Sequence, residues 1–256
     1  MKDGIARQVE DILREIEEKE HVKILHAVES GSRAWGFASP DSDYDVRFIY
    51  VRQKADYLSL NASRDVIEWQ LDELLDINGW DLKKALIQFR RGNATLFEWS
   101  NSPVVYKTTP EWARIYDVAK NYFSVKAAAY HYYGTAASTY CQYLQGEEVR
   151  YKKYFYALRP LLAGAYIQKY QCPPPVLFAE LMEMELPDEL RRGIEELLEI
   201  KKMSDEKHMG RRIPVIHDYI SEGIGQLKAF ADGARDDKKC DWNALNDVFF
   251  KSLPME

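Results

Sequence analysis

Residues 29–47 of the chain read ESGSRAWGFASPDSDYDVR, the most informative part of the sequence. The apolar run KILHAV at 23–28 leads into it and predicts a strand that stops at a turn on Gly31. After a Pro-Asp turn, Asp43 and Asp45 stand at the head of YDVRFIYV, whose β-branched and aromatic residues predict a second strand. The sequence thus indicates two strands joined through a glycine turn, with two aspartates opening the second.

The residues at this junction indicate a reaction type. Side chains two apart on a strand project from the same face, so Asp43 and Asp45 are expected side by side. Two such carboxylates repel each other unless a cation lies between them, and Mg²⁺ or Mn²⁺ prefers oxygen ligands. Gly31 allows a phosphate to approach the backbone, and Ser32 adds a hydroxyl and an amide. A metal site beside a phosphate site predicts phosphoryl or nucleotidyl transfer.

The flanking residues predict a small sheet with helices. Apolar residues at helical spacing predict a first helix, and short apolar runs predict two more strands that form a hairpin around Asp72-Glu73. A further amphipathic helix starts near Leu82 and ends at Gly92. The predicted elements are a helix at 5–20, strands at 65–71 and 74–78, and a helix at 82–91.

Beyond Pro103 the strand patterns end and helical patterns follow. We therefore expect an α+β fold with two domains: a catalytic domain over 1–104 and a helical domain over 105–256. The helices of the second half are predicted at 111–122, 124–145, 150–170, 176–185, 188–201, 213–231 and 242–251.

Composition and charge agree with a cytoplasmic protein. No apolar run approaches the length of a membrane span, the first twenty residues have no apolar signal region, and three widely spaced cysteines suit free thiols. The net charge is −6, but residues 105–170 hold nine Lys and Arg against four Asp and Glu. A basic segment among acidic ones suits a protein that holds metals on one side and phosphates on the other, although solvated helix faces give the same count.

Four stretches carry a family resemblance. The chain resembles the bacterial RNA-repair-pathway predicted nucleotidyltransferase family, within the DNA polymerase β-like superfamily. Members of that superfamily have Gly-Ser, a spacer of about ten residues and Asp-x-Asp, as found here. The matching stretches lie in both halves of the chain and are GSRAWGFASPDSDYDVRFIYV (31–51), DINGWDLKKAL (76–86), GNATLFEWSNSPVVY (92–106) and KKYFYALRPLLA (152–163).

The resemblance implies a third carboxylate on a strand beside the Asp-x-Asp strand. Asp65, Glu68 and Asp76 are the candidates, and Asp76 is preferred over Asp65 because an unpaired charge in the apolar run LLDIN is costly. Glu68 is expected to face solvent. Asp81 directly precedes a helical run and is expected to cap that helix.

Several basic residues are candidates for phosphate contacts. Arg33 follows the glycine turn and either meets a triphosphate oxygen or forms a surface ion pair. Arg47 shares a strand face with the aspartates and either neutralises them or meets the substrate. Lys152 and Arg159 are seven residues apart on one predicted helix face, and the resemblance implies that this helix closes over the nucleotide. A solvated helix face is the alternative.

Together these features predict transfer of a nucleoside monophosphate from an NTP to an acceptor hydroxyl. Mg²⁺ or Mn²⁺ held by Asp43, Asp45 and Asp76 would align the reacting groups, with Gly31 and Ser32 at the phosphates. The resemblance implies an RNA end as the acceptor and an RNA-repair ligase as a partner. A small-molecule or protein acceptor stays open, as does a catalytically silent nucleotide- or RNA-binding module of the same fold.

Overall fold

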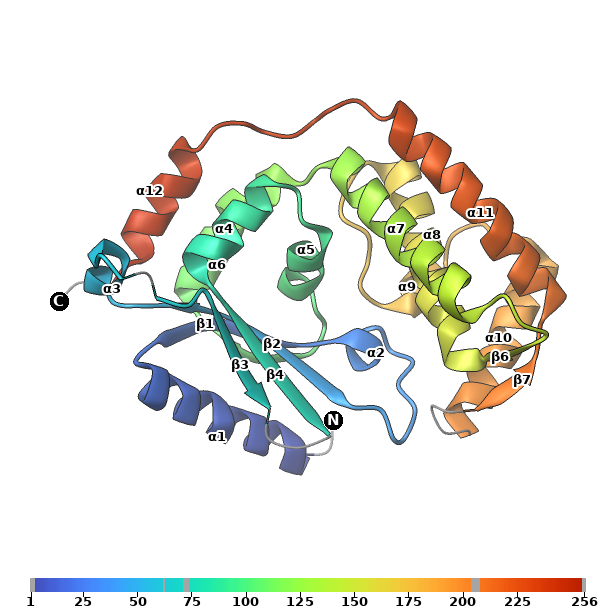
Figure 1. The fold of residues 1–256 in the computed structure, drawn as a ribbon, viewed down its shortest axis with the longest axis horizontal. Coiled ribbons are helices and arrows are strands. Elements are labelled where there is room, and N and C mark those ends of the chain that lie inside the picture. The colour runs from blue at the N-terminus through green and yellow to red at the C-terminus, as the bar shows by residue number, and fades with distance from the viewer. Residues whose placement is uncertain (1–2, 62, 71–73, 204–207, 255–256) are drawn as a thin grey trace.

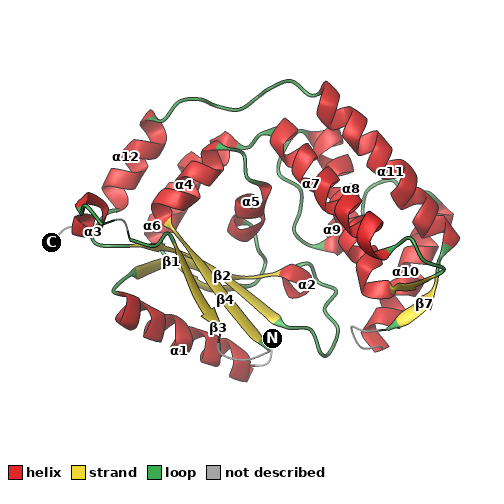
Figure 2. Ribbon diagram, viewed as in Figure 1, coloured by secondary structure: helices red, strands yellow, loops and turns green. Residues whose placement is uncertain are grey.

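The computed structural model describes residues 3–61, 63–70, 74–203 and 208–254. A five-stranded sheet with its helices forms one half of the molecule, and a bundle of helices forms the other (Figures 1 and 2). The helices are α1 (Asp3–Glu20), α2 (Gly31–Ala34), α3 (Lys54–Leu58), α4 (Leu82–Arg90), α5 (Ala94–Ser100), α6 (Pro110–Ala119), α7 (Val125–Tyr143), α8 (Tyr151–Tyr170), α9 (Phe178–Leu181), α10 (Asp188–Met203), α11 (Pro214–Gly233) and α12 (Asn243–Ser252). The strands are β1 (Lys23–Ser30), β2 (Tyr44–Val51), β3 (Val66–Gln70), β4 (Leu75–Asp81), β5 (Val105–Thr108), β6 (Glu148–Arg150) and β7 (Met209–Arg211).

The strand order of the main sheet brings the end of β1 close to the starts of β2 and β4. The strands follow the order β3-β4-β2-β1-β5; β2 and β4 are parallel, and the other neighbours are antiparallel. The end of β1 therefore meets the starts of β2 and β4, with Ser30 opposite Asp45. The strands predicted in the first half of the chain are confirmed within a few residues. The turn predicted at Asp72-Glu73 lies outside the described residues.

Alternation along β2 builds two hydrophobic layers. Val46, Phe48 and Tyr50 pack with the apolar face of α1, while Ile49 and Val51 face α4, α5, α6 and α12. Figure 1 shows α1 on one side of the sheet and α4, α5 and α6 on the other. Helices cover both faces of the sheet. The strand ends at the starts of β2 and β4 are therefore where polar side chains can reach solvent.

Strand β5 and helix α5 differ from the sequence-based expectation. The prediction that strands end at Pro103 is wrong, because β5 pairs with β1 at the sheet edge. A four-residue edge strand with one buried side chain, Tyr106, carries almost no periodic signal. Helix α5 is a second addition; Asn93 caps it by accepting a hydrogen bond from the amide of Thr95. The hydrophobic layer on the face of the sheet opposite α1 contains residues of α4, α5, α6 and α12. It therefore includes residues from both sides of the domain boundary expected at 104/105.

The second half of the molecule is mainly helical. Helices α7, α8, α10 and α11 share a hydrophobic core, and the seven predicted helical segments are confirmed with shorter bounds in some cases. Strands β6 and β7 form a separate two-stranded sheet that the sequence patterns did not indicate. Cys141, Cys172 and Cys240 are free thiols. No helix in the described part of the chain is both long and apolar enough to cross a lipid bilayer.

A buried histidine gives the sheet half a pH dependence. His26 on β1 stacks on Trp112 with ring centroids 4.9 Å apart, and its Nε2 lies 3.3 Å from the carbonyl oxygen of Trp99. Burial lowers the pKa of His26 from 6.5 to about 4, with the Trp99 carbonyl opposing the shift. The imidazole is therefore neutral in the folded protein at neutral pH.

We expect the free energy of unfolding to fall as the pH drops from 6.5 towards 4. The unfolded chain binds a proton at His26 in this range and the folded chain does not, which costs the folded state up to about 3 kcal/mol at 1.4 kcal/mol per pKa unit. Urea unfolding at several pH values measures this slope. His26→Asn should flatten the slope between pH 6.5 and 4, and an unchanged slope would assign it to other groups.

Candidate active site

Two aspartates are direct neighbours at the exposed strand ends where β2 and β4 begin. Asp45 on β2 and Asp76 on β4 are register partners in the parallel pair, so their side chains leave the same face. Asp43 lies just before β2 and is exposed. The sequence spacing predicts that Asp43 and Asp45 lie together, whereas the approach of Asp76 to Asp45 depends on the pairing of β2 with β4.

The other candidates for the third carboxylate lie elsewhere. The carboxylate of Asp65 is 3.0 Å from the Nζ of Lys84, and its carbonyl accepts a hydrogen bond from Asp81 at the opposite end of β4. Glu68 is exposed on β3. Asp81 accepts a hydrogen bond from the amide of Lys83 at 2.7 Å, which confirms its predicted role as the cap of α4. Of the candidates, Asp76 is the one that the fold brings to Asp45.

Arg47 links the two neighbouring aspartates. Its Nη2 lies 3.1 Å from Oδ1 of Asp45 and 2.7 Å from Oδ2 of Asp76. Its Nη1 donates to the carbonyl oxygens of Val46 and Asp76 at 3.1 and 3.0 Å. The sequence left open whether Arg47 neutralises the aspartates, and in this structure it bridges them.

The electrostatic environment of Asp45 combines burial with opposing charges. Burial raises the pKa of the Asp45 carboxyl; the positive charge of Arg47 opposes this, the negative charges of Asp76 and Asp43 add to it, and the positive charge of Lys152 opposes it again. Lys152 belongs to α8 in the helical half. Its positive charge therefore reaches Asp45 from the helical half of the molecule.

The glycine turn fits tightly against the aspartates. Gly31 has φ +62°, and a Cβ at this position would overlap Oδ2 of Asp45. A larger residue would therefore strain the backbone and push the carboxylate away. Ser32 follows on the short helix α2 with a side chain that is only 5% exposed. The close approach of Gly31 to Asp45 joins the predicted phosphate turn and the predicted carboxylates in one place.

Arg33 holds the loop between the turn and the aspartates. Its Nε donates to the carbonyl of Asp43 at 3.0 Å, its Nη2 donates to the carbonyl of Ser42, and its guanidinium lies 3.7 Å from the centroid of the Tyr44 ring. Ser39 in the same loop accepts a hydrogen bond from the buried Lys201 of α10 at 2.7 Å. The loop that ends at Asp43 is thus fastened both to α2 and to the helical half.

Sequence reasoning missed a buried glutamate behind the aspartates. Glu29 is 1% exposed; its Oε1 accepts a hydrogen bond from the amide of Asp45 at 2.8 Å, and its Oε2 accepts one from the phenol of Tyr106. Burial raises the pKa of Glu29, while these two donors lower it. The available signal was a carboxylate inside the apolar strand KILHAVES. Glu29 fixes the backbone from which the Asp45 side chain projects.

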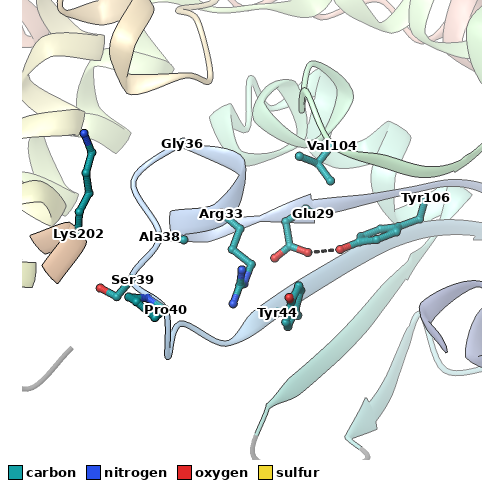
Figure 3. Close-up of a pocket in the computed structure, with 10 residues that line it drawn as sticks. All are labelled: Glu29, Arg33, Gly36, Ala38, Ser39, Pro40, Tyr44, Val104, Tyr106 and Lys202. Carbon is teal, nitrogen blue, oxygen red and sulfur yellow. Dashed lines mark hydrogen bonds between the residues drawn. The ribbon is translucent and has the colours of Figure 1, made fainter. Parts of the chain in front are cut away.

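Glu29 also lines a cavity of about 600 Å³ beside the site (Figure 3). In Figure 3, Arg33 extends between Pro40 and Tyr44, and Lys202 stands on the opposite side. The wall comes from β1, β2 and β5, from the loop after α2 and from α10. Its residues are Glu29, Arg33, Gly36, Ala38, Ser39, Pro40, Tyr44, Val104, Tyr106 and Lys202.

The structure separates the two basic residues that were expected on one helix face. Lys152, in the first turn of α8, affects Asp45 electrostatically. The Arg159 side chain is 3% exposed, with Nη1 2.8 Å from Oε1 of Glu98 on α5 and both Nε and Nη2 bonded to the carbonyl of Val176. Its guanidinium also lies 4.5 Å from the centroid of the Trp35 ring. Arg159 therefore joins the two halves instead of lining the site.

The neighbouring carboxylates of Asp45 and Asp76 have the oxygen atoms that a metal site needs, but these atoms are not arranged around a position for a metal ion. Oxygen donors of the right kind are present at Asp45 and Asp76, but the Arg47 guanidinium lies between them. Within the described residues, no group of three or more His, Cys, Asp or Glu side chains is placed to hold a metal ion. As arranged here, these residues do not fit a bound Mg²⁺ or Mn²⁺.

Comparison with known proteins gives three findings. The model of a family described as "RNA repair pathway DNA polymerase beta family" matches residues 5–251. The chain is 43% identical over 253 residues to the uncharacterized protein YcgL of Bacillus subtilis (strain 168), covering 97% of this chain and 96% of that one. A crystal structure of a nucleotidyltransferase-like protein from Exiguobacterium sibiricum 255-15 aligns with a TM-score of 0.31 at 12% identity, over 95% of this chain and 79% of that one.

Proposed function

Because the chain belongs to the RNA repair pathway DNA polymerase beta family, we propose that it transfers a nucleoside monophosphate from an NTP to the hydroxyl of an RNA end. The observation that carries this proposal is the meeting of Asp45, Asp76 and the Gly31 turn where β1 ends and β2 and β4 begin. Acidic groups beside a glycine turn suit a bound triphosphate and an attacking hydroxyl. An RNA-repair ligase is the partner that such a role implies.

In the proposed reaction, the acceptor oxygen forms a bond to the α-phosphorus and the bond from that phosphorus to the bridging oxygen breaks. Pyrophosphate leaves with the electron pair, and the hydroxyl proton passes to Asp76, whose side chain is 55% exposed at the edge. Gly31 lets the turn approach the Asp45 carboxylate closely, and Lys152 attracts the negative charge of the phosphates. Glu29 and Arg33 position Asp45 and the loop before it. Mg²⁺ or Mn²⁺ is the ion that the sequence predicts for such a reaction, although the carboxylates of Asp45 and Asp76 do not fit it in the arrangement described above.

Incubation with labelled NTPs tests the proposal. Each α-labelled NTP is supplied with Mg²⁺ or Mn²⁺ and a panel of RNA ends, and labelled RNA and pyrophosphate are measured. We expect label to move onto RNA with one pyrophosphate released per transfer. The Asp45→Asn protein, purified identically, controls for contaminating enzymes. Label on a small molecule or a protein would redirect the acceptor assignment, and NTP binding without turnover would indicate a silent binding module.

Lys152→Glu should raise the apparent nucleotide constant more than tenfold. A lost charge-assisted contact to phosphate costs on the order of 1.5–3 kcal/mol, whereas an exposed ion pair is worth at most about 1 kcal/mol. Calorimetric titration with an NTP measures the change. Lys153→Glu is the matched control, because Lys153 lies on the same helix with its Nζ 4.0 Å from the ring centroid of Tyr143. If Lys152→Glu impairs only transfer to RNA, this helix belongs to the acceptor side.

A further inference from the structure

The start of α8 is joined to the glycine turn through aromatic rings. The backbone amide of Trp35 donates to the carbonyl of Gly31 at 3.0 Å, and the Trp35 ring packs against that of Tyr156 on α8 with centroids 5.4 Å apart. One turn earlier on α8, the Nζ of Lys152 lies 5.6 Å from the Tyr156 ring centroid, and its charge reaches Asp45. Trp35 and Tyr156 therefore connect the candidate active site to the surface at the start of this helix.

The same pairing of ring and cation continues outward from the site. The Nζ of Lys153 lies 5.4 Å from the ring centroid of Tyr156 and 4.0 Å from that of Tyr143, the last residue of α7. Tyr143 is 45% exposed, so part of its ring is open to a flat partner from solvent. Rings and lysines thus alternate along one path from Trp35 to Tyr143.

The ribbon of β6 and β7 adds positive charge beside this path. In Figure 1, β6, β7 and the start of α8 lie together at the lower end of the bundle. Residues 147–153 and 208–212 contain five Lys and Arg against two Glu, although the chain as a whole has a net charge of −6. Arg150 is exposed on β6, and its register partner on β7 is the uncharged Met209. Positive charge therefore extends from the start of α8 onto the ribbon.

Single-stranded nucleic acid is the partner whose chemistry matches rings that alternate with cations. Its unpaired bases stack on aromatic side chains, and its phosphates attract Lys and Arg along the backbone. In a duplex the base faces are stacked on one another and cannot cover a tyrosine ring. A surface of this kind should therefore prefer a single strand over a duplex of the same sequence.

We propose that this surface, which we call the α8 track, binds the single-stranded end of the RNA that supplies the acceptor hydroxyl. The inference rests on the proposed function and adds to it the path of the acceptor strand. A base stacked on Tyr143 leaves a neighbouring phosphate beside Lys153, and the strand then passes Tyr156 to reach the glycine turn. The α8 track consists of Trp35, Tyr143, Arg150, Lys152, Lys153 and Tyr156.

Fluorescence anisotropy with a short labelled single-stranded RNA, measured without NTP or divalent ion, tests the α8 track. Tyr143→Leu should raise the Kd at least about fivefold, because the stacking of one base is lost. Lys153→Gln and Arg150→Gln should each weaken binding, and each should reduce the slope of log Kd against log salt concentration by about 0.7, the value for one phosphate contact to a single strand.

Tyr170→Leu and Lys169→Gln are the matched controls. Both residues are exposed in the last turn of the same helix, and the Nζ of Lys169 lies 5.2 Å from the ring centroid of Tyr170. They have the same ring and cation at the other end of α8, so each change should alter the Kd less than about twofold. A melting temperature close to the native value shows that each variant is folded.

Photocrosslinking of RNA that contains thiouridine gives a second readout. Crosslinks should fall in peptides that contain Tyr143 or Tyr156, and crosslinks confined to other peptides would overturn the inference. An unchanged Kd in Tyr143→Leu, or a duplex that binds as tightly as the single strand, would overturn it as well. Neither readout needs turnover, so a protein without transferase activity can pass this test, and a transferase that acts on a small molecule fails it.

Discussion

Asp76→Asn should lower nucleotide transfer by at least about 100-fold, whereas Asp65→Asn should leave it within about twofold. The two residues were rival candidates for the third carboxylate, and the fold places Asp76 beside Asp45 and Asp65 beside Lys84 at the far end of the sheet. Removal of one preorganised charged group at a reacting centre typically costs about 10²–10³ in rate. Asp45→Asn should behave as Asp76→Asn does.

Melting temperatures separate this result from unfolding. Asp76 is more than half exposed, and the amide oxygen introduced by Asp76→Asn can still accept from Arg47, so stability should change by about 0.5 kcal/mol or less. The assay is single-turnover transfer from labelled NTP with the divalent ion in excess. Equal activity in Asp76→Asn and the native protein would remove Asp76 from the site. Equal loss in Asp65→Asn and Asp76→Asn would indicate a general effect of charge.

Arg159→Met should lower the free energy of unfolding by about 3–5 kcal/mol. The change leaves the carboxylate of Glu98 buried with a hydrogen bond from the phenol of Tyr132 but without its cation, and an unpaired buried charge is costly. Burial alone raises the pKa of Glu98, yet Arg159 and the hydrogen bonds bring it below its ordinary value. The carboxylate is thus ionised in the folded protein and depends on Arg159.

Urea denaturation measures the loss, with two comparisons. Glu98→Gln combined with Arg159→Met should recover more than half of it, because the buried charge is removed as well. Lys228→Ala, which breaks an exposed pair with Asp232, should cost less than about 1 kcal/mol. A loss below about 1 kcal/mol in Arg159→Met would show that the ion pair does not hold the halves together. By linkage, the Glu98 contribution is present above its unfolded pKa and fades as the pH falls through the lowered folded value.

The parts of the site that sequence reasoning found are those with local signals. The glycine turn, the two-residue spacing of Asp43 and Asp45, and the cap at Asp81 each depend on a few neighbouring residues. The preference for Asp76 came from an unpaired charge in an apolar run, and the parallel pairing of β2 and β4 supplies its contact with Asp45. The metal and catalytic roles of these residues stay predictions.

The parts that it missed depend on distant partners. Glu29 acquires its role from Tyr106, 77 residues away, and Arg159 acquires its role from Glu98, 61 residues away. Helical spacing placed Arg159 on the face of Lys152, but it carries no information on which part of that face another helix covers. Strand β5 also depends on a distant partner. Its four residues lie at the edge of the sheet and form a strand by pairing with β1.

The position of α12 has a consequence for how the protein is made. In Figure 1 the chain leaves α11 and crosses back to the sheet half, where Leu245 and Val248 of α12 complete the hydrophobic layer of α4 and α6. The sheet half is translated first, but α12, which completes its hydrophobic layer, is translated after the entire helical bundle. Until then the parts of α4 and α6 that α12 covers stay exposed to other chains in the cell. During synthesis, the hydrophobic layer over the sheet that carries the site is therefore completed only after α12 has been translated.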